Sequence, residues 1–216
     1  MSNNLKKRMY TSMGLILLLT LMFFNIYILA YFLMIIGVFS ILEFASMNKK
    51  IFRDEIYKSI FLDILFFSYI FFVLSAFFIL SFFSHLKILI FIILLTCIAS
   101  DIGGFIFGKL LKGPKLTKIS PQKTISGSLG SIILSTVILS ILIYYFTNSF
   151  EINIFIVGLI TSITCQLGDL FFSLLKRKSK IKDTGNILPG HGGVLDRVDG
   201  ILLGLPLGFI IMVIVY

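Results

Sequence analysis

Several residue types that soluble and secreted proteins use freely are scarce or absent in this chain. Its 216 residues include no tryptophan, two cysteines, two histidines and four prolines. The cysteines, Cys97 and Cys165, both lie in apolar segments, so the sequence indicates neither a disulfide framework nor a zinc site. Charged residues make up only 13% of the chain and hydrophobic residues 58%, a balance that excludes a soluble domain. The sequence therefore predicts an integral membrane protein.

Long apolar runs fill most of the remaining sequence. A helix needs about 20 apolar residues to cross a bilayer, and about 17 are tolerated. The run from Met9 to Met47 is too long for one crossing and suits two short ones that turn near Asn25. The segments predicted to cross the membrane are 10–26, 28–46, 60–82, 88–108, 128–147, 152–175 and 200–216. We therefore expect an all-α polytopic helical bundle with about seven transmembrane helices, folded as a single domain over 1–216.

Basic residues outnumber acidic ones by 19 to 10, and they are unevenly placed along the chain. In the seven-helix arrangement, 18 of the 19 lysines and arginines fall on one side of the membrane and only Lys87 falls on the other. The positive-inside rule makes the basic side cytoplasmic, as expected of a multi-pass protein of the cell (inner) membrane. The basic start, residues 1–8, has no convincing cleavage site after it, so we expect an uncleaved first helix. Nucleic acid is a poor partner for this chain, because the basic residues follow the helix ends.

The stretch from Gln166 to Gly200 concentrates opposite charges at a predicted membrane edge. It holds four of the ten acids and six basic residues, with several glycines and one proline between them. Carboxylates hold a hard cation through oxygen, and lysine and arginine neutralise phosphate oxygens, so this composition is typical of a site for a metal–polyphosphate complex. The charged residues are Asp169, Lys176, Arg177, Lys178, Lys180, Lys182, Asp183, Asp196, Arg197 and Asp199.

Spacing and depth single out some of these acids. Asp169, Ser173 and Arg177 follow one another at four-residue intervals and would share one helix face. Asp169 and Asp101 each lie about seven residues, or ~10 Å, inside a predicted transmembrane helix. An acid at that depth costs about 2.5–3.5 kcal/mol, which favours a shared functional site over the alternatives of protonation or a partner on a neighbouring helix. Glu43 and Asp63 lie near predicted helix ends, where a carboxylate is expected to reach interfacial water.

An ordered series of motifs runs through the charged stretch. It consists of Ser173, the basic pair Lys176 and Arg177, Lys182 with Asp183, Gly185, Pro189-Gly190-His191-Gly192-Gly193, and Asp196-Arg197-Val198-Asp199. Every spacing in this series fits the signature of the phosphatidate cytidylyltransferases, also called CDP-diacylglycerol synthases. A chance match of this length and variety is improbable, so the chain closely resembles that family.

A second stretch, from Ser100 to Gly130, adds to the resemblance. The residues that match the family pattern there are Asp101, Gly108, Lys109, Ser120, Pro121, Lys123, Thr124 and Gly127. Two positions depart from it, because the family usually has a lysine where Gln122 stands and an acid where Ser126 stands. The motifs that match the family lie within residues 100–200. The first 99 residues resemble the family only in general character.

The resemblance implies a reaction and a set of roles. CTP and phosphatidic acid would give CDP-diacylglycerol and pyrophosphate for phospholipid biosynthesis, with Mg²⁺ held by Asp169 and Asp196. The candidate catalytic residues are Asp169, Asp196, Lys176, Arg177, Lys182, Asp183 and Arg197. The candidate substrate-binding residues are Ser173, His191, Gly192, Gly193, Asp199, Asp101, Lys109, Ser120, Lys123 and Thr124. A second cation and a homodimer both stay open.

Two other classes of function compete with this interpretation. A transporter or channel would also place acids inside apolar helices, but it does not predict the dense loop of lysine, aspartate and glycine. A CTP-dependent lipid kinase, or a cytidylyltransferase acting on an isoprenoid lipid, would keep a charged membrane edge. Neither is expected to keep the whole run from Pro189 to Asp199.

Overall fold

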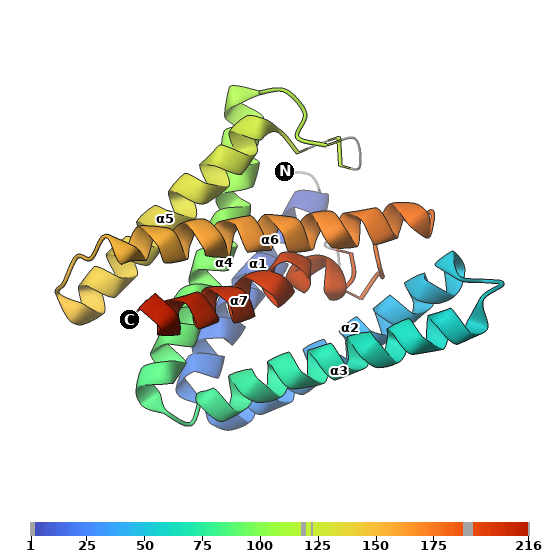
Figure 1. Ribbon diagram of the computed structural model, residues 1–216, viewed down its shortest axis with the longest axis horizontal. Helices are drawn as coiled ribbons and strands as arrows, with labels where there is room; N and C mark the ends of the chain where they lie inside the picture. Colours follow the sequence, from blue (N-terminus) through green and yellow to red (C-terminus); the bar gives the residue numbers. More distant parts are fainter. Residues whose placement is uncertain (1–2, 118–119, 122, 188–191, 216) are drawn as a thin grey trace. The chain divides into compact units, whose positions relative to one another are not determined.

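A computed structural model describes residues 3–117, 120, 121, 123–187 and 192–215. Within them the chain forms seven α-helices and one isolated β-bridge, between Lys115 and Thr124 (Figure 1). The helices are α1 (Asn3–Phe24), α2 (Ile26–Ile51), α3 (Ile56–Leu80), α4 (Ser84–Leu111), α5 (Ile125–Thr147), α6 (Asn153–Lys178) and α7 (Leu195–Val215). The predicted all-α class is confirmed.

The chain is a polytopic helical membrane protein. Six helices, α2 to α7, are long and apolar enough to cross a bilayer, whereas the apolar part of α1, Met13–Phe24, is shorter. The predicted turn near Asn25 is also correct. The Asn25 side chain accepts hydrogen bonds from the backbone N–H groups of Tyr27 (2.9 Å) and Ile28 (3.3 Å), which makes it the N-cap of α2.

The connections between the helices alternate in charge along the chain. The connections after α1, α3 and α5 (residue 25 and segments 81–83 and 148–152) contain no lysine or arginine. The connections after α2, α4 and α6 (52–55, 112–124 and 179–194) all contain basic residues. This alternation is the pattern expected of helices that cross a membrane in succession.

The chain divides into two compact units. The first unit comprises Met1–Ser84 and Leu175–Val198, and the second comprises His85–Leu174 and Asp199–Tyr216. In the first unit α2 and α3 run side by side (Figure 1). The rings of Phe44 and Phe66 stack with centroids 3.9 Å apart, and the buried Asn48 amide donates to the Ser59 carbonyl and to Asp63, each at 2.8 Å. Polar and aromatic contacts therefore join these two helices.

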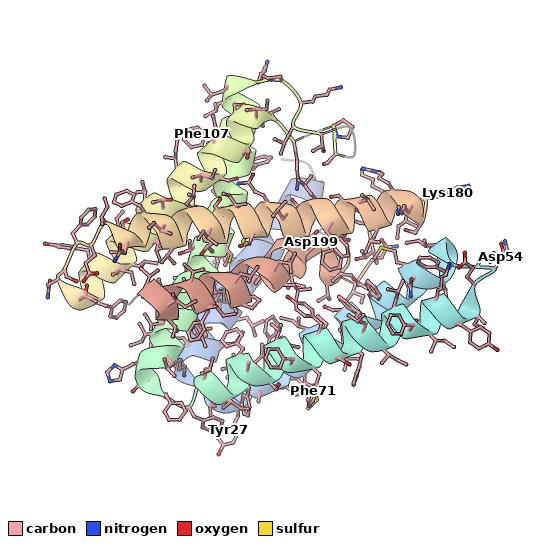
Figure 2. All side chains as sticks on the ribbon, in the orientation of Figure 1. Tyr27, Asp54, Phe71, Phe107, Lys180 and Asp199 are labelled. Atoms are coloured by element: carbon pink, nitrogen blue, oxygen red, sulfur yellow. The ribbon has the colours of Figure 1, made fainter. Side chains whose placement is uncertain are left out.

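In the second unit α4 and α5 approach closely through glycine. A Cβ atom added at Gly103 would lie 2.5 Å from the carbonyl oxygen of Gly130, and one added at Gly130 would collide with the Phe107 ring. Phe107 is labelled in Figure 2, which shows every described side chain. Membrane helices without a hydrophobic drive between them gain most of their attraction from such close backbone packing. These two glycines therefore set the distance between α4 and α5.

Polar side chains also link three helices of the second unit. The hydroxyls of Ser100 and Ser162 lie 2.8 Å apart, and the Gln166 amide donates to the Ser162 hydroxyl at 3.2 Å. The same amide group accepts from the Ser128 hydroxyl and donates to the Ser128 carbonyl. This network fixes α4, α5 and α6 around Gln166, three residues before Asp169.

Gly103→Ala is expected to lower the stability of the protein in detergent by about 1–3 kcal/mol, because the new methyl group must displace backbone. The matched control is Gly14→Ala in α1, where a Cβ atom meets no described atom within 4 Å. There alanine should be neutral or stabilising by up to about 1 kcal/mol, the difference in helix propensity. Thermal unfolding of both variants in one detergent checks the comparison. Equal effects would show that the α4–α5 contact is loose.

Candidate active site

In the first unit three residues of the charged stretch contact the carboxylate of Asp196, at the start of α7. One oxygen, Oδ1, pairs with the Lys176 ammonium at 2.8 Å. The other, Oδ2, accepts from the backbone N–H groups of Thr184 (2.8 Å) and Gly193 (3.0 Å). The Asp196 side chain is only 6% exposed and that of Lys176 13%. Asp196 thus ties the end of α6 to both ends of the connecting loop.

Glu43 of α2 is part of the same structure, and the expectation that it reaches interfacial water is wrong. It is 5% exposed, and its carboxylate accepts from the Thr184 hydroxyl (2.6 Å) and from the N–H groups of Val194 (3.0 Å) and Leu195 (2.9 Å). The sequence did contain one indication that Glu43 is buried, because Glu43 lies among apolar residues as Asp101 and Asp169 do. Its contacts with the loop could not be derived, since they join positions 141 to 152 residues apart.

The remaining charged groups of this loop face outward. Arg177, Lys182, Asp183 and Arg197 are all exposed, so solvent reaches each of them. Gly192 has a φ of 82°, and a Cβ atom there would lie 2.9 Å from Oδ2 of Asp196. This position needs glycine both for its backbone conformation and for its close approach to the carboxylate. His191, another candidate, lies outside the described residues.

In the second unit Asp169 of α6 forms an ion pair with Lys123, which precedes α5. The Ser173 hydroxyl, one turn further along α6, lies 3.4 Å from Oδ1 of Asp169. Both charged side chains are partly exposed, 32% for Asp169 and 23% for Lys123, so a ligand can reach them. The pair joins the two stretches that carry the motifs, which the sequence alone left separate.

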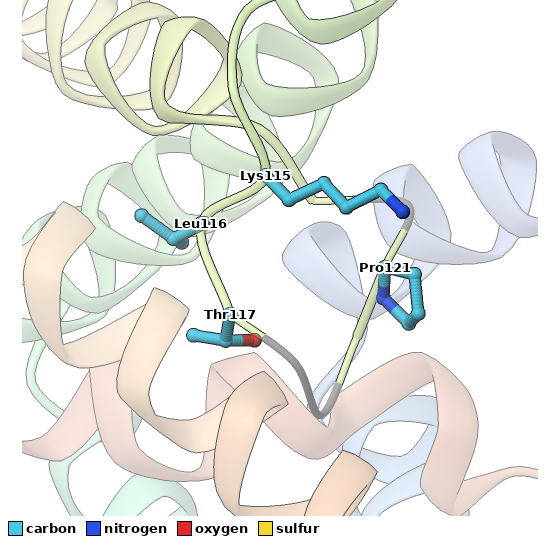
Figure 3. A pocket seen from close by; sticks show the side chains of 4 residues that line it. All are labelled: Lys115, Leu116, Thr117 and Pro121. Atoms are coloured by element: carbon cyan, nitrogen blue, oxygen red, sulfur yellow. The ribbon is translucent and has the colours of Figure 1, made fainter.

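Backbone hydrogen bonds hold Lys123 against the start of the connection between α4 and α5. The N–H of Leu116 donates to the Lys123 carbonyl at 2.8 Å, and that of Ile125 donates to the Pro114 carbonyl at 2.9 Å. Thr124 is the N-cap of α5, with its hydroxyl accepting from the Gly127 N–H at 3.1 Å. A cavity of about 370 Å³ lies against this loop, lined by Lys115, Leu116, Thr117 and Pro121 (Figure 3).

The other candidates have varied surroundings. The Ser126 hydroxyl, at a position that departs from the family pattern, accepts from the Gly113 N–H at 3.2 Å and so has a structural contact. Asp101 is exposed and stands ten residues before the end of α4, while Asp169 stands nine before the end of α6. Lys109 lies 5.8 Å from the centre of the Phe105 ring.

Two further candidates lie near the loops. Asp199 (labelled in Figure 2) is buried, with Oδ1 accepting from the Gly200 N–H at 2.9 Å. The Ser120 carbonyl accepts from the Lys123 N–H at 3.0 Å, so the backbone of Ser120 helps to place Lys123.

Comparison with known proteins shows the family of this chain and several of its relatives. Residues 2–215 match the model of the cytidylyltransferase family. The chain belongs to this family. A phosphatidate cytidylyltransferase of Rickettsia bellii is 46% identical over 121 residues, which are 51% of this chain and 52% of that protein. Proteins of the same name from Staphylococcus haemolyticus (43% over 118 residues) and Helicobacter pylori (44% over 113) match 53% and 52% of this chain. The match covers 45% and 42% of those two proteins. The chain thus spans about half the length of the curated relatives it matches.

The oxygen donors around Asp169 fit a hard divalent cation. Mg²⁺ usually binds through one or two carboxylates and completes its shell with water and substrate phosphates. Asp169 offers a partly exposed carboxylate with the Ser173 hydroxyl beside it. Among the described residues no group of three or more acidic, histidine or cysteine side chains gathers around a point, so phosphate oxygens and water would supply the rest. Asp196 already accepts three hydrogen bonds, which leaves about one acceptor position free on Oδ1.

Proposed function

We propose that this member of the cytidylyltransferase family is a phosphatidate cytidylyltransferase, an enzyme that makes CDP-diacylglycerol and pyrophosphate from CTP and phosphatidic acid. The observation that carries the proposal is the Lys123–Asp169 pair, which joins one residue from each motif stretch, both of them in the second unit. The names of the relatives support the choice of substrates. A lysine beside a partly exposed acid on a membrane helix is better suited to binding a phosphate and a cation than to forming an ion pathway.

The reaction needs positioning and charge neutralisation more than proton transfer. An oxygen of the lipid phosphate forms a new bond to the α-phosphorus of CTP. The bond from that phosphorus to the oxygen bridging the α- and β-phosphates breaks, and pyrophosphate leaves with the electron pair. Because the attacking oxygen is already anionic, no strong base is required. The main demands are to bring two polyanions together and to stabilise negative charge on the leaving group.

The charged residues divide these tasks. Lys123, Lys176, Lys182, Arg177 and Arg197 would bind phosphate oxygens, and Asp183 would orient Lys182 or share in binding the cation. Asp169, with help from Ser173, would hold Mg²⁺, and Asp196 would offer a cation its one remaining acceptor position. When bound, the ion would neutralise part of the triphosphate charge. Release of Lys123 from Asp169 would then supply a cation for phosphate.

We also propose where the enzyme works. The basic connections after α2, α4 and α6 would face the cytoplasm of a bacterial inner membrane, where CTP is found. A homodimer and a second bound cation remain part of the proposal, to be decided by measurement of mass in detergent and by metal titration.

The test uses purified protein in detergent with phosphatidic acid, Mg²⁺ and CTP labelled in either the α- or the γ-phosphate. We expect the α-label to enter lipid, the γ-label to leave as pyrophosphate, and EDTA to abolish both. Entry of the γ-label into lipid would instead identify a CTP-dependent lipid kinase. Transfer only to an isoprenoid phosphate would identify a different acceptor. No transfer to any lipid by folded protein would favour the transporter interpretation.

A further inference from the structure

Glu43 makes contacts that are unusual for an acid in an apolar helix. Both carboxylate oxygens accept hydrogen bonds, Oε1 from the Val194 N–H and Oε2 from the Thr184 hydroxyl and the Leu195 N–H. All three donors belong to the loop and helix start that carry the motif series. A buried carboxylate is costly without such partners, so the side chain and the loop stabilise each other.

The three donors lie at the two ends of one loop. Thr184 stands near its beginning, while Val194 and Leu195 form its junction with α7. The first N–H groups of a helix have no partner inside the helix, and a negative charge beside them is favourable. Glu43 therefore caps α7 from another helix and also holds Thr184.

Glycines in the loop fit this carboxylate closely. A Cβ atom at Gly185 would lie 2.6 Å from Oε1 of Glu43, and one at Gly193 would collide with both oxygens and with the Thr184 hydroxyl. The loop thus packs directly on the acid, with no space for a larger side chain at either position.

Glu43 is too buried to meet a substrate, so it must act through the loop. The same Thr184 and Gly193 that touch Glu43 also donate their N–H groups to Asp196, which holds Lys176. We propose that Glu43 is a positioning residue for the nucleotide site: it holds Thr184 and the Val194–Leu195 junction in place and so sets where Lys176, Lys182 and Asp183 meet the phosphates. The effect of Glu43 on catalysis rests on the proposed function, whereas its contacts with Thr184, Val194 and Leu195 do not depend on that function.

The experiment compares Glu43→Gln with a matched acid-to-amide change, Asp63→Asn. Asp63 is in the same unit, and the bond it accepts from Asn48 can be kept by an asparagine oxygen. Hydrogen bonds to a charged acceptor are stronger than those to a neutral amide, so Glu43→Gln should lower kcat/KM for CTP by at least about tenfold. The effect should fall mainly on KM for CTP, with KM for phosphatidic acid nearly unchanged. Asp63→Asn should change neither.

A second pair of variants separates positioning from general weakening of the fold. Thr184→Ser keeps the hydroxyl that donates a hydrogen bond to Glu43, so this variant should retain activity. Thr184→Val removes that hydroxyl and should raise KM for CTP. The double variant Thr184→Val with Glu43→Gln should lower kcat/KM for CTP by less than the product of the two single fold-changes, since both changes remove the same contact. Additive losses, or equal rises in the KM of both substrates, would overturn the proposal.

Amide hydrogen exchange gives a readout that does not depend on activity. In Glu43→Gln the peptides covering 184–187 and 192–195 should exchange faster, while those of α3 should not. If the wild type transfers no cytidylyl group, the proposed function fails, but this comparison still decides whether Glu43 holds the loop. Unchanged exchange in Glu43→Gln would refute the positioning role even in an active enzyme.

Discussion

Asp169→Asn is expected to lower the rate of CDP-diacylglycerol formation by about 100- to 1,000-fold, a loss typical for removal of a group that stabilises transition-state charge. The change deletes the charge that pairs with Lys123 and that would hold the cation. Because Asp169 is about one third exposed, its amide should be tolerated, and thermal unfolding should shift little. Single-turnover rates at saturating CTP and several Mg²⁺ concentrations measure the effect.

The control for Asp169→Asn is Glu151→Gln, an exposed acid in the connection between α5 and α6 of the same unit. It should leave the rate unchanged. Lys123→Met should lose activity as well, while Lys123→Arg should keep part of it, since the charge is preserved but the shape of the donor differs. Full activity in Lys123→Met would show that the ion pair is structural and that Asp169 works without it.

The helices were predictable because one physical signal dominates them. Apolar runs long enough to cross a bilayer can form only helices or barrels, and the turn at Asn25 follows from its capping side chain. Most predicted helices were a few residues too short at one or both ends, because the helices continue into polar segments such as 176–178. The predicted ends at 26 and 82 instead lie two residues beyond the observed helices. Hydrophobicity marks where a helix is buried in lipid, whereas hydrogen bonding decides where it stops.

The partners within the site were less predictable, because they depend on contacts between distant residues. The motifs indicated Lys123 and Asp169 separately, and only the packing of α5 with α6 pairs them. Glu43 lies where the resemblance is weakest, so no motif drew attention to it. The one indication in the sequence was that Glu43 is an acid in an apolar run. The functional role inferred from that feature for Asp101 and Asp169 should have been inferred for Glu43 as well.

Asp196→Ala is expected to cost about 3–5 kcal/mol of stability, as found when one partner of a buried ion pair is removed. Lys176 would be left as a charge only 13% exposed, and the N–H groups of Thr184 and Gly193 would lose their acceptor. Activity should fall with stability, because Lys176 would no longer be held in place. Unfolding in a graded series of denaturing detergent, followed by circular dichroism, gives the free energy.

Comparison with Lys176→Met tests whether the amide bonds of Asp196 matter as much as its charge pair. Lys176→Met leaves the carboxylate with its two N–H donors, so it should cost clearly less stability than Asp196→Ala. The double variant Lys176→Met with Asp196→Ala removes both members of the ion pair but leaves the Thr184 and Gly193 N–H groups without the Asp196 acceptor, so it should recover only part of the loss. If the double variant were as stable as the wild type, the pair alone would define this site. If Lys176→Met were the more damaging change, Asp196 would hold the loop less firmly than its three hydrogen bonds indicate.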